Sequence, residues 1–338
     1  MRVGIIGCGL IGRKRTLALE KKDELIACCD TNSVIGKKFA DDFKCKFYSD
    51  YKKLIDDSNC DAVIVAVVNK YIKKIVIYAL KKGKHVIAEK PLGRNAKEAE
   101  QMIKTLNAAN KNRKRKLVLK TGFNHRFHPA LLKAKSIFDS GEIGKLMFIR
   151  AAYGHGGRNG MEKEWRASKD LCGGGELLDQ GVHIIDLSRW FAGDIAKIFG
   201  ISKTKFWNMK VEDNAFVHMT AKSGADVHFN VSWTNWKNIF SFEIFCTKGY
   251  LKISGFGGSY GKETLEVGIR KSEGGRPNIK KYSFPKEDKS WNREWREFKL
   301  AIKDNRPVLG DGIDGLKANM IIENIYKSNK LGKTVSIK

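Results

Sequence analysis

The sequence predicts an α/β protein with two domains, a parallel sheet with helices on both faces followed by an α+β domain with a large, mostly antiparallel sheet. Three observations support this. Short apolar runs alternate with helical patterns up to about residue 122. Longer strand patterns joined by hairpin-like turns follow them. The length of 338 residues exceeds what one hydrophobic core usually organises, so we expect domains at residues 1–122 and 123–338.

The first domain is predicted from apolar runs that alternate with helical patterns. The runs are Val3–Ile6, Leu25–Cys29, Lys46–Tyr48, Ala62–Val68, His85–Ala88 and Leu117–Thr121. The helical patterns are Leu10–Lys21, Val34–Phe43, Lys70–Lys82 and Ala96–Lys111. Runs this continuously apolar are typical of parallel strands that are buried on both faces.

The second domain is predicted from a different rhythm. Its helical patterns are Pro129–Ser140, Gln180–Phe191, Trp291–Asn305 and Gly312–Lys330. Its strand patterns are Leu146–Tyr153, Lys197–Lys205, Asn214–Thr220, Asp226–Trp233, Ser241–Cys246, Tyr250–Ser254 and Thr264–Arg270. Turns such as Lys222-Ser223-Gly224 indicate antiparallel neighbours. We expect helices on one face and an open face that packs on another subunit of a homodimer or homotetramer.

Composition and targeting signals narrow the class of protein. With 42% hydrophobic residues and 5 prolines, the chain resembles an ordinary globular protein. We expect a cytoplasmic protein without a membrane span, because neither a signal peptide nor a sufficiently long apolar run is evident. The 7 cysteines show no CxxC pair and no histidine at zinc spacing, so we expect reduced packing thiols and no metal site.

The strong basic charge raises the alternative of nucleic-acid binding. The formal charge is +27 with a pI near 9.7, and basic runs occur at Arg13-Lys14-Arg15 and at residues 111–116. The lysines, however, are scattered over all predicted helices, and no DNA-binding or RNA-binding motif accompanies them. We expect no dedicated nucleic-acid partner. A basic surface could still attract anionic small substrates such as sugar phosphates or nucleotide sugars.

A glycine-rich loop predicts a dinucleotide site. Gly7-Cys8-Gly9-Leu10-Ile11-Gly12 follows the first apolar run and opens the first helix. In such a Rossmann fingerprint Gly7 permits the tight turn, Gly9 lets the backbone approach the pyrophosphate, and Gly12 allows close packing of helix and strand. The amides of Leu10 and Ile11 at the helix start would face the phosphates. The alternative is a tight turn without a ligand.

Asp30 indicates which dinucleotide binds. It ends the second run, 18 residues after Gly12, where a carboxylate accepts hydrogen bonds from both ribose hydroxyls and repels a 2′-phosphate. We therefore favour NAD over NADP. Two points stay open: Asp30 could be a helix N-cap, a role that Asn32 could fill equally well, and Arg13-Lys14-Arg15 could accommodate a phosphate.

Two further motifs carry groups for proton transfer. Glu89-Lys90-Pro91 follows a parallel strand, where open α/β sheets place their ligands, although an isolated lysine there could also lie on the surface. Asp179 and His183 are four residues apart and share one face of a predicted helix. A histidine can take the proton of an alcohol, and a nearby carboxylate orients it. The alternative for this pair is a helix cap and a packed histidine.

These segments together resemble the glucose–fructose oxidoreductase / inositol dehydrogenase / MocA (Gfo/Idh/MocA) family over nearly the whole chain. The matching segments are Gly7–Gly12, Glu89-Lys90-Pro91, Gly122–Pro129 and Gly173–His183. The resemblance implies a Rossmann domain, a second domain on a large sheet, assembly through that sheet, and nicotinamide-dependent chemistry on polyols, sugars or nucleotide sugars.

The resemblance also implies roles for individual residues. Lys90, Asp179 and His183 would form the catalytic group, Glu89 would line the cofactor pocket, and the residues near the substrate would include Asn124 and Arg126. One departure is the turn Asn69-Lys70-Tyr71, because many members of the family have a Thr-Pro-like turn and a histidine there. Cofactor contacts from this turn are therefore open.

A loop between a strand and the catalytic helix is expected to set specificity. It runs from Gly154 to Arg166 and carries Arg158, Trp165 and Arg166, which suit a phosphate, a carboxylate or a stacked sugar ring. The alternative is a solvated loop. We expect an NAD(P)-dependent enzyme that transfers a hydride between nicotinamide and a ring carbinol carbon, with sugar or nucleotide-sugar substrates favoured over inositol. The contrasting function is a non-catalytic regulator that responds to NAD.

Overall fold

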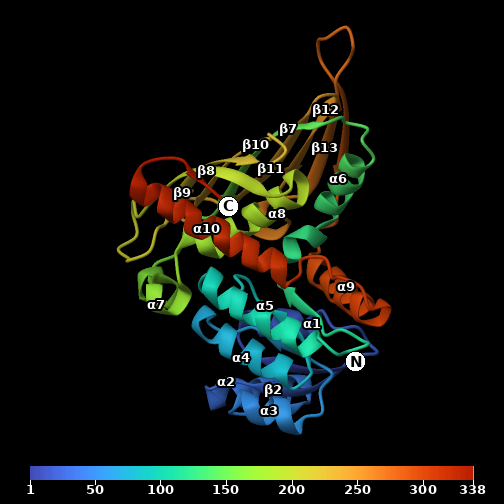
Figure 1. Cartoon of the computed structure of the whole chain (residues 1–338), viewed down its shortest axis with the longest axis vertical. Coiled ribbons are helices and arrows are strands. Elements are labelled where there is room, and N and C mark those ends of the chain that lie inside the picture. The colour runs from blue at the N-terminus through green and yellow to red at the C-terminus, as the bar shows by residue number, and fades with distance from the viewer. Residues whose placement is uncertain (338) are drawn as a thin grey trace. The chain divides into compact units, whose positions relative to one another are not determined.

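The computed structural model describes residues 1–337 and divides into two compact units (Figure 1). Unit 1 contains residues 1–124 and 291–319, and unit 2 contains residues 125–290 and those from 320 onward. The first change of unit lies two residues from the predicted boundary. The segment 291–319, which the sequence suggested for the second domain, instead belongs to unit 1.

Unit 1 is built on a six-stranded parallel sheet with the strand order β3-β2-β1-β4-β5-β6. This is the order of a doubly wound Rossmann sheet, with the topological switch between β1 and β4. The strands are β1 (Arg2–Ile6), β2 (Glu24–Cys29), β3 (Lys46–Tyr48), β4 (Ala62–Val65), β5 (His85–Ala88) and β6 (Leu119–Thr121). All four residues of β4 are buried, as expected for a strand covered on both faces.

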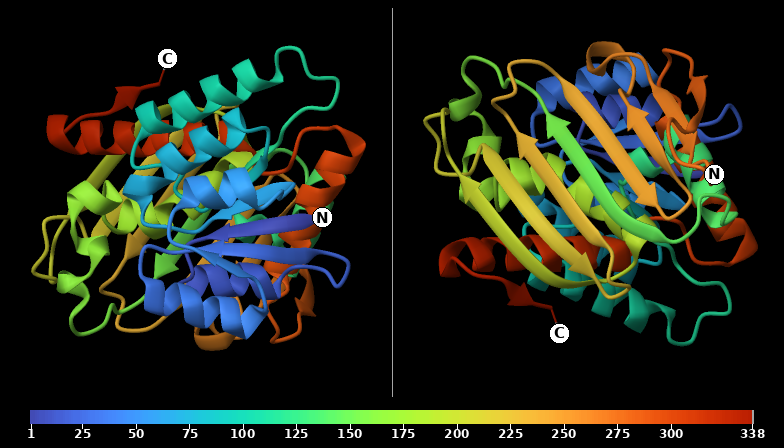
Figure 2. Two further views of the ribbon diagram at one scale, coloured as in Figure 1. Left: turned by 90° about the horizontal axis from the view of Figure 1, so that it is seen from below. Right: turned by 90° about the horizontal axis from the view of Figure 1, so that it is seen from above.

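Helices cover both faces of this sheet (Figure 2, left). They are α1 (Leu10–Leu17), α2 (Ser33–Phe43), α3 (Tyr51–Asp57), α4 (Asn69–Lys81), α5 (Ala96–Asn110) and, from the end of the chain, α9 (Ser290–Asp304). One apolar cluster joins the sheet to α3, α4 and α5, and a second joins it to α2 and α9. Trp295 and Phe298 of α9 are at most 2% exposed in the second cluster, which explains why residues 291–319 belong to this unit.

Unit 2 is built on a nine-stranded sheet with the order β14-β13-β12-β11-β7-β10-β9-β8-β15. The strands are β7 (Leu146–Gly154), β8 (Ile195–Lys203), β9 (Asn214–Ala221), β10 (Asp226–Ser232), β11 (Ile239–Cys246), β12 (Gly249–Ser254), β13 (Thr264–Ile269), β14 (Asn278–Ser283) and β15 (Val335–Ser336). Within residues 1–337, the neighbours in this sheet are antiparallel except for β7 and β10. Together with the parallel sheet of unit 1, this confirms the predicted fold class.

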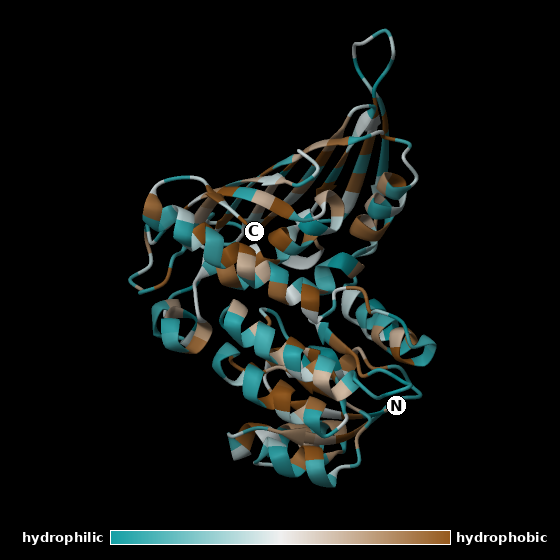
Figure 3. Ribbon diagram, in the orientation of Figure 1, coloured by the Kyte–Doolittle hydropathy of each residue, from teal (hydrophilic) through white to brown (hydrophobic). Residues whose placement is uncertain are grey.

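The two faces of this sheet differ. The strands alternate hydrophobic and hydrophilic residues (Figure 3), and the helices that pack on one face include α6 (Pro129–Asp139) and α8 (Val182–Ala192). Residues of α10 (Gly312–Leu331) join them, since Ile325 abuts Gly200 of β8. The other face is open and is turned toward the viewer in the right view of Figure 2. It exposes Phe148, Phe199 and Phe216, each between 38% and 40% exposed.

Short helical segments complete the chain. They are η1 (Asn124–Phe127), η2 (Met161–Lys163), η3 (Trp165–Ala167), α7 (Lys169–Cys172), η4 (Leu177–Gly181) and η5 (Gly258–Tyr260). All seven cysteines are free thiols. Within residues 1–337, no helix has both the length and the apolar character that a membrane span requires.

Candidate active site

In the glycine loop of unit 1, a side chain would clash with the backbone at Gly7 and Gly12 but not at Gly9. A Cβ on Gly7, whose φ is +101°, would lie 2.2 Å from the carbonyl oxygen of Ala66. A Cβ on Gly12 would lie 2.0 Å from the carbonyl oxygen of Gly7. A Cβ on Gly9 would meet nothing within 4 Å. The fold therefore requires glycine at the turn and at the helix contact, and it leaves space at the position where a pyrophosphate would approach.

Asp30 joins this loop to the end of β2. Its carboxylate accepts hydrogen bonds from the backbone N–H of Cys8 at 2.9 Å and of Asn32 at 2.9 Å. The side chain of Asn32 caps α2 by accepting from the N–H groups of Val34 and Ile35. The cap role is thus filled by Asn32, while Asp30 lies next to the glycine loop, where a ribose-binding carboxylate is expected.

The three cations after the loop are held by other groups. Arg13 donates to Asp42 at 2.6 Å and lies 5.4 Å from the ring centroid of Phe39. Lys14 lies 5.8 Å from the ring centroid of Trp291, and Arg15 is only 2% exposed. A cation that recognises a 2′-phosphate has to reach the adenosine ribose, so these contacts favour NAD over NADP.

Arg15 belongs to a buried charge network that includes Glu89. The Nε of Arg15 donates to Oε1 of Glu89 at 2.6 Å, and its Nη1 donates to Glu294 of α9. The Nζ of Lys120, on β6, lies 3.3 Å from Glu294. Two cations and two carboxylates thus balance one another at 7% exposure or less. The network fixes the residue before Lys90. The role of Glu89 in lining the cofactor pocket stays a prediction.

Lys90 lies at the carboxyl edge of the parallel sheet, where Gly7 and Asp30 also lie. It comes two residues after the end of β5, and both neighbours hold this strand end: the N–H of Glu89 donates to Val65 of β4, and the N–H of Gly122 donates to Ala88. The sheet order puts β5 two strands from β1. Lys90 is therefore carried by the rigid edge of the sheet on which the glycine loop stands.

Asn69 and Asn124 occupy the starts of helical segments in unit 1. Asn69, from the turn that departs from the family pattern, is the first residue of α4 and is 7% exposed. Asn124 is the first residue of η1 and is 6% exposed. Their contacts with cofactor or substrate stay predictions.

Asp179 and His183 of unit 2 lie on either side of a change of helix type. Asp179 is in η4, which is a π-helical turn, and His183 is in the first turn of α8. The predicted arrangement, with both residues in one regular α-helix, is therefore modified. π-helical turns inside helices are rare and frequent at functional sites, because the extra residue redirects neighbouring side chains. Such a turn leaves no signal in hydrophobic periodicity.

His183 is buried against another histidine. Its ring is stacked on that of His125, with centroids 3.6 Å apart and planes at 13°. His183 is 4% exposed and His125 is 7% exposed. The Nε2 of His125 is 3.1 Å from the hydroxyl of Tyr153 on β7. His125 lies inside the Gly122–Pro129 motif, but no role could be predicted for it, because nothing in the sequence relates residue 125 to residue 183.

Two tyrosines lie in the same region of unit 2. Burial raises the pKa of Tyr153 well above its usual value and also raises the pKa of Tyr260. Gln180 of η4 donates to the hydroxyl of Tyr260 at 3.3 Å, and the two tyrosine rings are 5.6 Å apart. Both phenols therefore stay protonated at neutral pH and provide hydroxyl groups next to the histidine pair. Sequence reasoning missed both.

The predicted specificity loop brings one of its two arginines to Asp179. The Nε of Arg166 is 3.4 Å from Oδ2 of Asp179, and the Arg166 guanidinium lies 4.5 Å from the ring centroid of Trp165. Arg158 is exposed and forms a two-bond pair with Glu164 at 2.8 and 2.5 Å. Carboxylates therefore face both arginines of the loop.

Arg126, a predicted substrate neighbour, is 3% exposed and forms a two-bond ion pair with Asp186 of α8 at 2.8 and 2.5 Å. Its guanidinium also lies 5.6 Å from the ring centroid of Trp190. These contacts anchor η1 to α8 and so help to place His125. A direct contact of Arg126 with the substrate stays a prediction.

The glycine run before η4 has a packing role. A Cβ on Gly175 would lie 1.9 Å from the carbonyl oxygen of Glu212. The Glu212 carboxylate accepts from the N–H groups of Gly175 and Leu177 and from the hydroxyl of Tyr326 at 2.7 Å. Burial raises the pKa of Glu212. These bonds fix the segment that leads into Asp179.

Comparison with known protein families agrees with both units. Residues 1–114 match a model described as "Oxidoreductase family, NAD-binding Rossmann fold", and residues 131–252 match the "GFO/IDH/MocA C-terminal domain". Together the two matches cover more than half of the chain. The chain belongs to the GFO/IDH/MocA oxidoreductase family. This confirms the resemblance seen in the sequence, and the description of the first model confirms NAD as the predicted cofactor.

Relatives within the GFO/IDH/MocA family include sugar and inositol dehydrogenases. Levoglucosan dehydrogenase of Pseudarthrobacter phenanthrenivorans is 28% identical over 60% of this chain, but the match spans only 54% of that enzyme. Myo-inositol 2-dehydrogenase of Thermotoga maritima is 27% identical over 100% of this chain and 99% of its own length. A levoglucosan dehydrogenase solved with NADH shares the fold, with a TM-score of 0.89 and 22% identity over 100% of this chain and 99% of the other.

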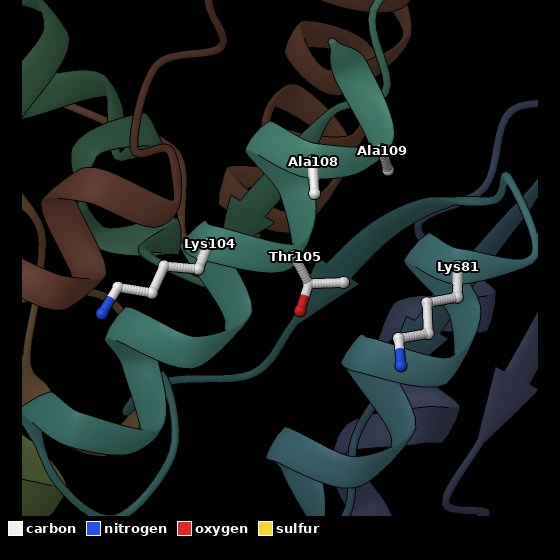
Figure 4. Close-up of a pocket in the computed structure, with 5 residues that line it drawn as sticks. All are labelled: Lys81, Lys104, Thr105, Ala108 and Ala109. Atoms are coloured by element: carbon white, nitrogen blue, oxygen red, sulfur yellow. The ribbon is translucent and has the colours of Figure 1, made fainter.

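A hollow on unit 1 is lined by none of the predicted site residues. It is lined by residues of α4 and α5, namely Lys81, Lys104, Thr105, Ala108 and Ala109 (Figure 4). None of these residues was predicted to act on cofactor or substrate. Within residues 1–337, no three His, Cys, Asp or Glu side chains form a group that could hold a metal ion.

Proposed function

We propose that this protein is an NAD-dependent dehydrogenase that interconverts a ring secondary alcohol and the corresponding ketone of an uncharged sugar or polyol. One observation carries the proposal. The family's acid–base residues are present on ordered elements, with Lys90 at the carboxyl edge of the Rossmann sheet and Asp179 and His183 at a π-to-α junction. A regulator that only senses NAD would not need all three groups.

The residues of unit 1 fit NAD. The open space at Gly9 and the amides at the start of α1 suit a pyrophosphate, and Asp30 suits the ribose hydroxyls. When bound, NAD supplies the acceptor or donor of the hydride. Gly7 and Gly12 hold the loop in its shape, and Glu89, fixed by Arg15, precedes the catalytic lysine.

The proton of the alcohol is handled by side chains of this chain. His183 acts as the general base in alcohol oxidation and as the general acid in the reverse direction. Lys90 donates a hydrogen bond to the substrate oxygen and joins the proton relay. Asp179, which Arg166 contacts at 3.4 Å, orients the substrate or the imidazole.

The charges of the specificity loop support an uncharged substrate. Arg158 is paired with Glu164, and Arg166 lies against both Glu164 and Asp179. A phosphate would have to displace a carboxylate to reach either guanidinium. Trp165, stacked on Arg166, supplies an aromatic surface of the kind on which sugar rings pack. The named activities of the levoglucosan and myo-inositol relatives agree with this substrate class.

The test replaces Lys90 and His183 singly by alanine and measures NADH formation with inositols, anhydrosugars and aldoses. We expect kcat/KM to fall about 10²- to 10⁴-fold for each variant, while NADH affinity changes little. Matched controls are Lys104→Ala and His218→Gln, which remove an exposed lysine and a half-exposed histidine. Full turnover in the Lys90 and His183 variants would refute the assigned roles, and tight NADH binding without turnover of any substrate would favour the regulator.

We also propose that the open face of the nine-stranded sheet packs against a second copy of the chain. Phe148 is stacked on Phe245 with centroids 4.6 Å apart, and both lie beside the exposed Arg150, which pairs with the buried Glu243. The exposed side chains of Phe148, Phe199 and Phe216 on this face favour burial in an oligomer. The variant Phe148→Glu, Phe216→Glu should shift the mass measured by light scattering toward the monomer. An unchanged mass would contradict the proposal.

We further propose a cytoplasmic location and no dedicated nucleic-acid partner. Seven free thiols suit a reducing compartment. The cations of Arg13-Lys14-Arg15 are engaged with carboxylates and aromatic rings, which leaves less charge for phosphates. Cell fractionation tests the location. Binding to duplex DNA that survives physiological salt would contradict the second point.

A further inference from the structure

The inference concerns His125 and rests on the proposed function of His183. We propose that His125 is a positioning residue for His183: its ring supports one face of the His183 imidazole and restricts the stacked pair to one proton at a time. The sequence separates these residues by 58 positions. The fold of unit 2 brings their ring centroids to 3.6 Å with nearly parallel planes.

His125 is itself held on several sides by aromatic rings. Phe256 meets its ring edge-on at 4.6 Å, and the rings of Tyr153 and Phe240 lie at 5.4 and 6.2 Å. The hydroxyl of Tyr153 is 3.1 Å from Nε2 of His125. An imidazole that is packed between aromatic rings and hydrogen-bonded at one nitrogen provides a rigid surface. The plane of His183 is then fixed by contact with it.

Stacking has a specific consequence for a general base. It uses the face of the imidazole and does not consume the ring-edge nitrogens that exchange protons. A neutral ring at this distance also stabilises a cationic neighbour through its π face. His125 therefore favours the imidazolium that forms when His183 takes the proton of the substrate.

The same contact limits protonation. Two imidazolium rings 3.6 Å apart would repel each other strongly in a buried site, so the second proton binds only at lower pH. Other titratable groups of unit 2 near the pair come from several elements. They are Tyr153 on β7, Tyr260 on η5, Glu176 beside η4, Asp179 on η4 with its partner Arg166, and His128 with Glu263 and Asp288.

The experiment compares His125→Phe with His125→Ala, each in the wild-type and in the His183→Ala background. Phenylalanine keeps a flat ring but removes the titrating nitrogens, whereas alanine removes the ring. We expect His125→Ala to lower kcat by about 10- to 100-fold with little change in KM, because the base is misplaced, and His125→Phe to keep most of the turnover. Neither change should lower activity further when His183 is already alanine.

A second readout does not depend on turnover. The imidazole protons of the cofactor-free protein are titrated by NMR with labelled histidine. We expect the stacked pair of the wild type to titrate in two steps, and His183 in His125→Phe to titrate in one step, about one pH unit or more above the lower step. Because His125→Phe keeps an aromatic ring at this position, the titration still tests the inference if His125→Ala fails to fold. NADH fluorescence and thermal melting check folding.

The outcomes distinguish a failure of this inference from a failure of the proposed role of His183. If His183→Ala retains full turnover, both the proposed role of His183 and the inference are wrong. If His183→Ala is impaired but the His125 variants cost the same in both backgrounds, only the inference is overturned. Two wild-type rings that titrate together in one step, or an effect confined to KM, would also overturn it.

Discussion

The two units carry their candidate functional groups in different ways. In unit 1 the groups come directly after parallel strands, so the backbone sets their positions. The glycine loop follows β1, Asp30 follows β2 and Lys90 follows β5. In unit 2 the groups are side chains from distant segments, such as His125, Tyr153 and His183. Unit 1 should therefore be sensitive to added atoms, and unit 2 to the loss of a partner.

The largest expected effect is the loss of a buried partner in unit 2. Replacing Arg126 by methionine leaves the carboxylate of Asp186 buried without its cation, so we expect the free energy of unfolding to fall by about 3–5 kcal/mol. The matched control is Arg150→Met. Arg150 also makes a two-bond pair with a glutamate, but its side chain is 62% exposed, and the expected loss is at most about 1 kcal/mol.

Denaturant titration with hydrogen exchange localises this effect. Faster exchange should concentrate in η1 and α8 of unit 2 in the Arg126 variant. Similar losses of unfolding free energy in the two arginine variants would show that burial of the arginine does not determine the loss. They would contradict the expectation that unit 2 is sensitive to the loss of a buried partner.

An intermediate effect is expected from added atoms in the glycine loop of unit 1. Gly12→Ala places a methyl group 2.0 Å from the carbonyl oxygen of Gly7, so the free energy of unfolding should fall by about 1–3 kcal/mol. Gly9→Ala meets no protein atom within 4 Å. It should leave stability within about 0.5 kcal/mol and weaken NADH binding about tenfold or more, because the methyl group would stand where we propose that the pyrophosphate approaches.

Thermal melting and NADH fluorescence quenching measure the two quantities separately. Equal loss of stability in both variants would contradict the assigned packing difference. Unchanged NADH affinity in Gly9→Ala would place the pyrophosphate elsewhere.

The sequence predicted most of unit 1 because its signals are local. The strand His85–Ala88 and the loop Gly7–Gly12 each follow from adjacent residues. Helix α3 was missed because it has seven residues, of which only Leu54 and Ile55 are buried, although Asp50 caps it. The last segment, residues 291–319, could not be placed because an amphipathic helix does not reveal which sheet it will cover.

The sequence predicted the elements of unit 2 better than its site. The edge strand β14 was missed because Asn278–Ser283 is exposed and lysine-rich, without apolar alternation. Asp179 and His183 were identified from a local motif, but their π-helical junction was not. The stack of His125 on His183 depends on how two distant segments pack, which periodicity and spacing do not encode.

The last expected effect appears only at acidic pH and concerns unit 1, through His85. Burial lowers the pKa of His85 from 6.5 to about 4, and its Nδ1 accepts a hydrogen bond from the N–H of Val118 at 3.1 Å, which requires the neutral ring. The unfolded chain binds a proton at higher pH than the folded one. The contribution of His85 to stability is therefore complete above about pH 6.5 and is lost as the pH falls through about 4.

His85→Gln removes this titration while keeping a polar side chain. The wild type should lose roughly 1–3 kcal/mol of unfolding free energy between neutral and acidic pH that the variant does not lose, as measured by urea titration across this range. His218→Gln is the control because this side chain is half exposed on the open face of unit 2. Parallel acid dependence in wild type and His85→Gln would mean that other groups govern the response, and a response in His218→Gln alone would assign it to unit 2.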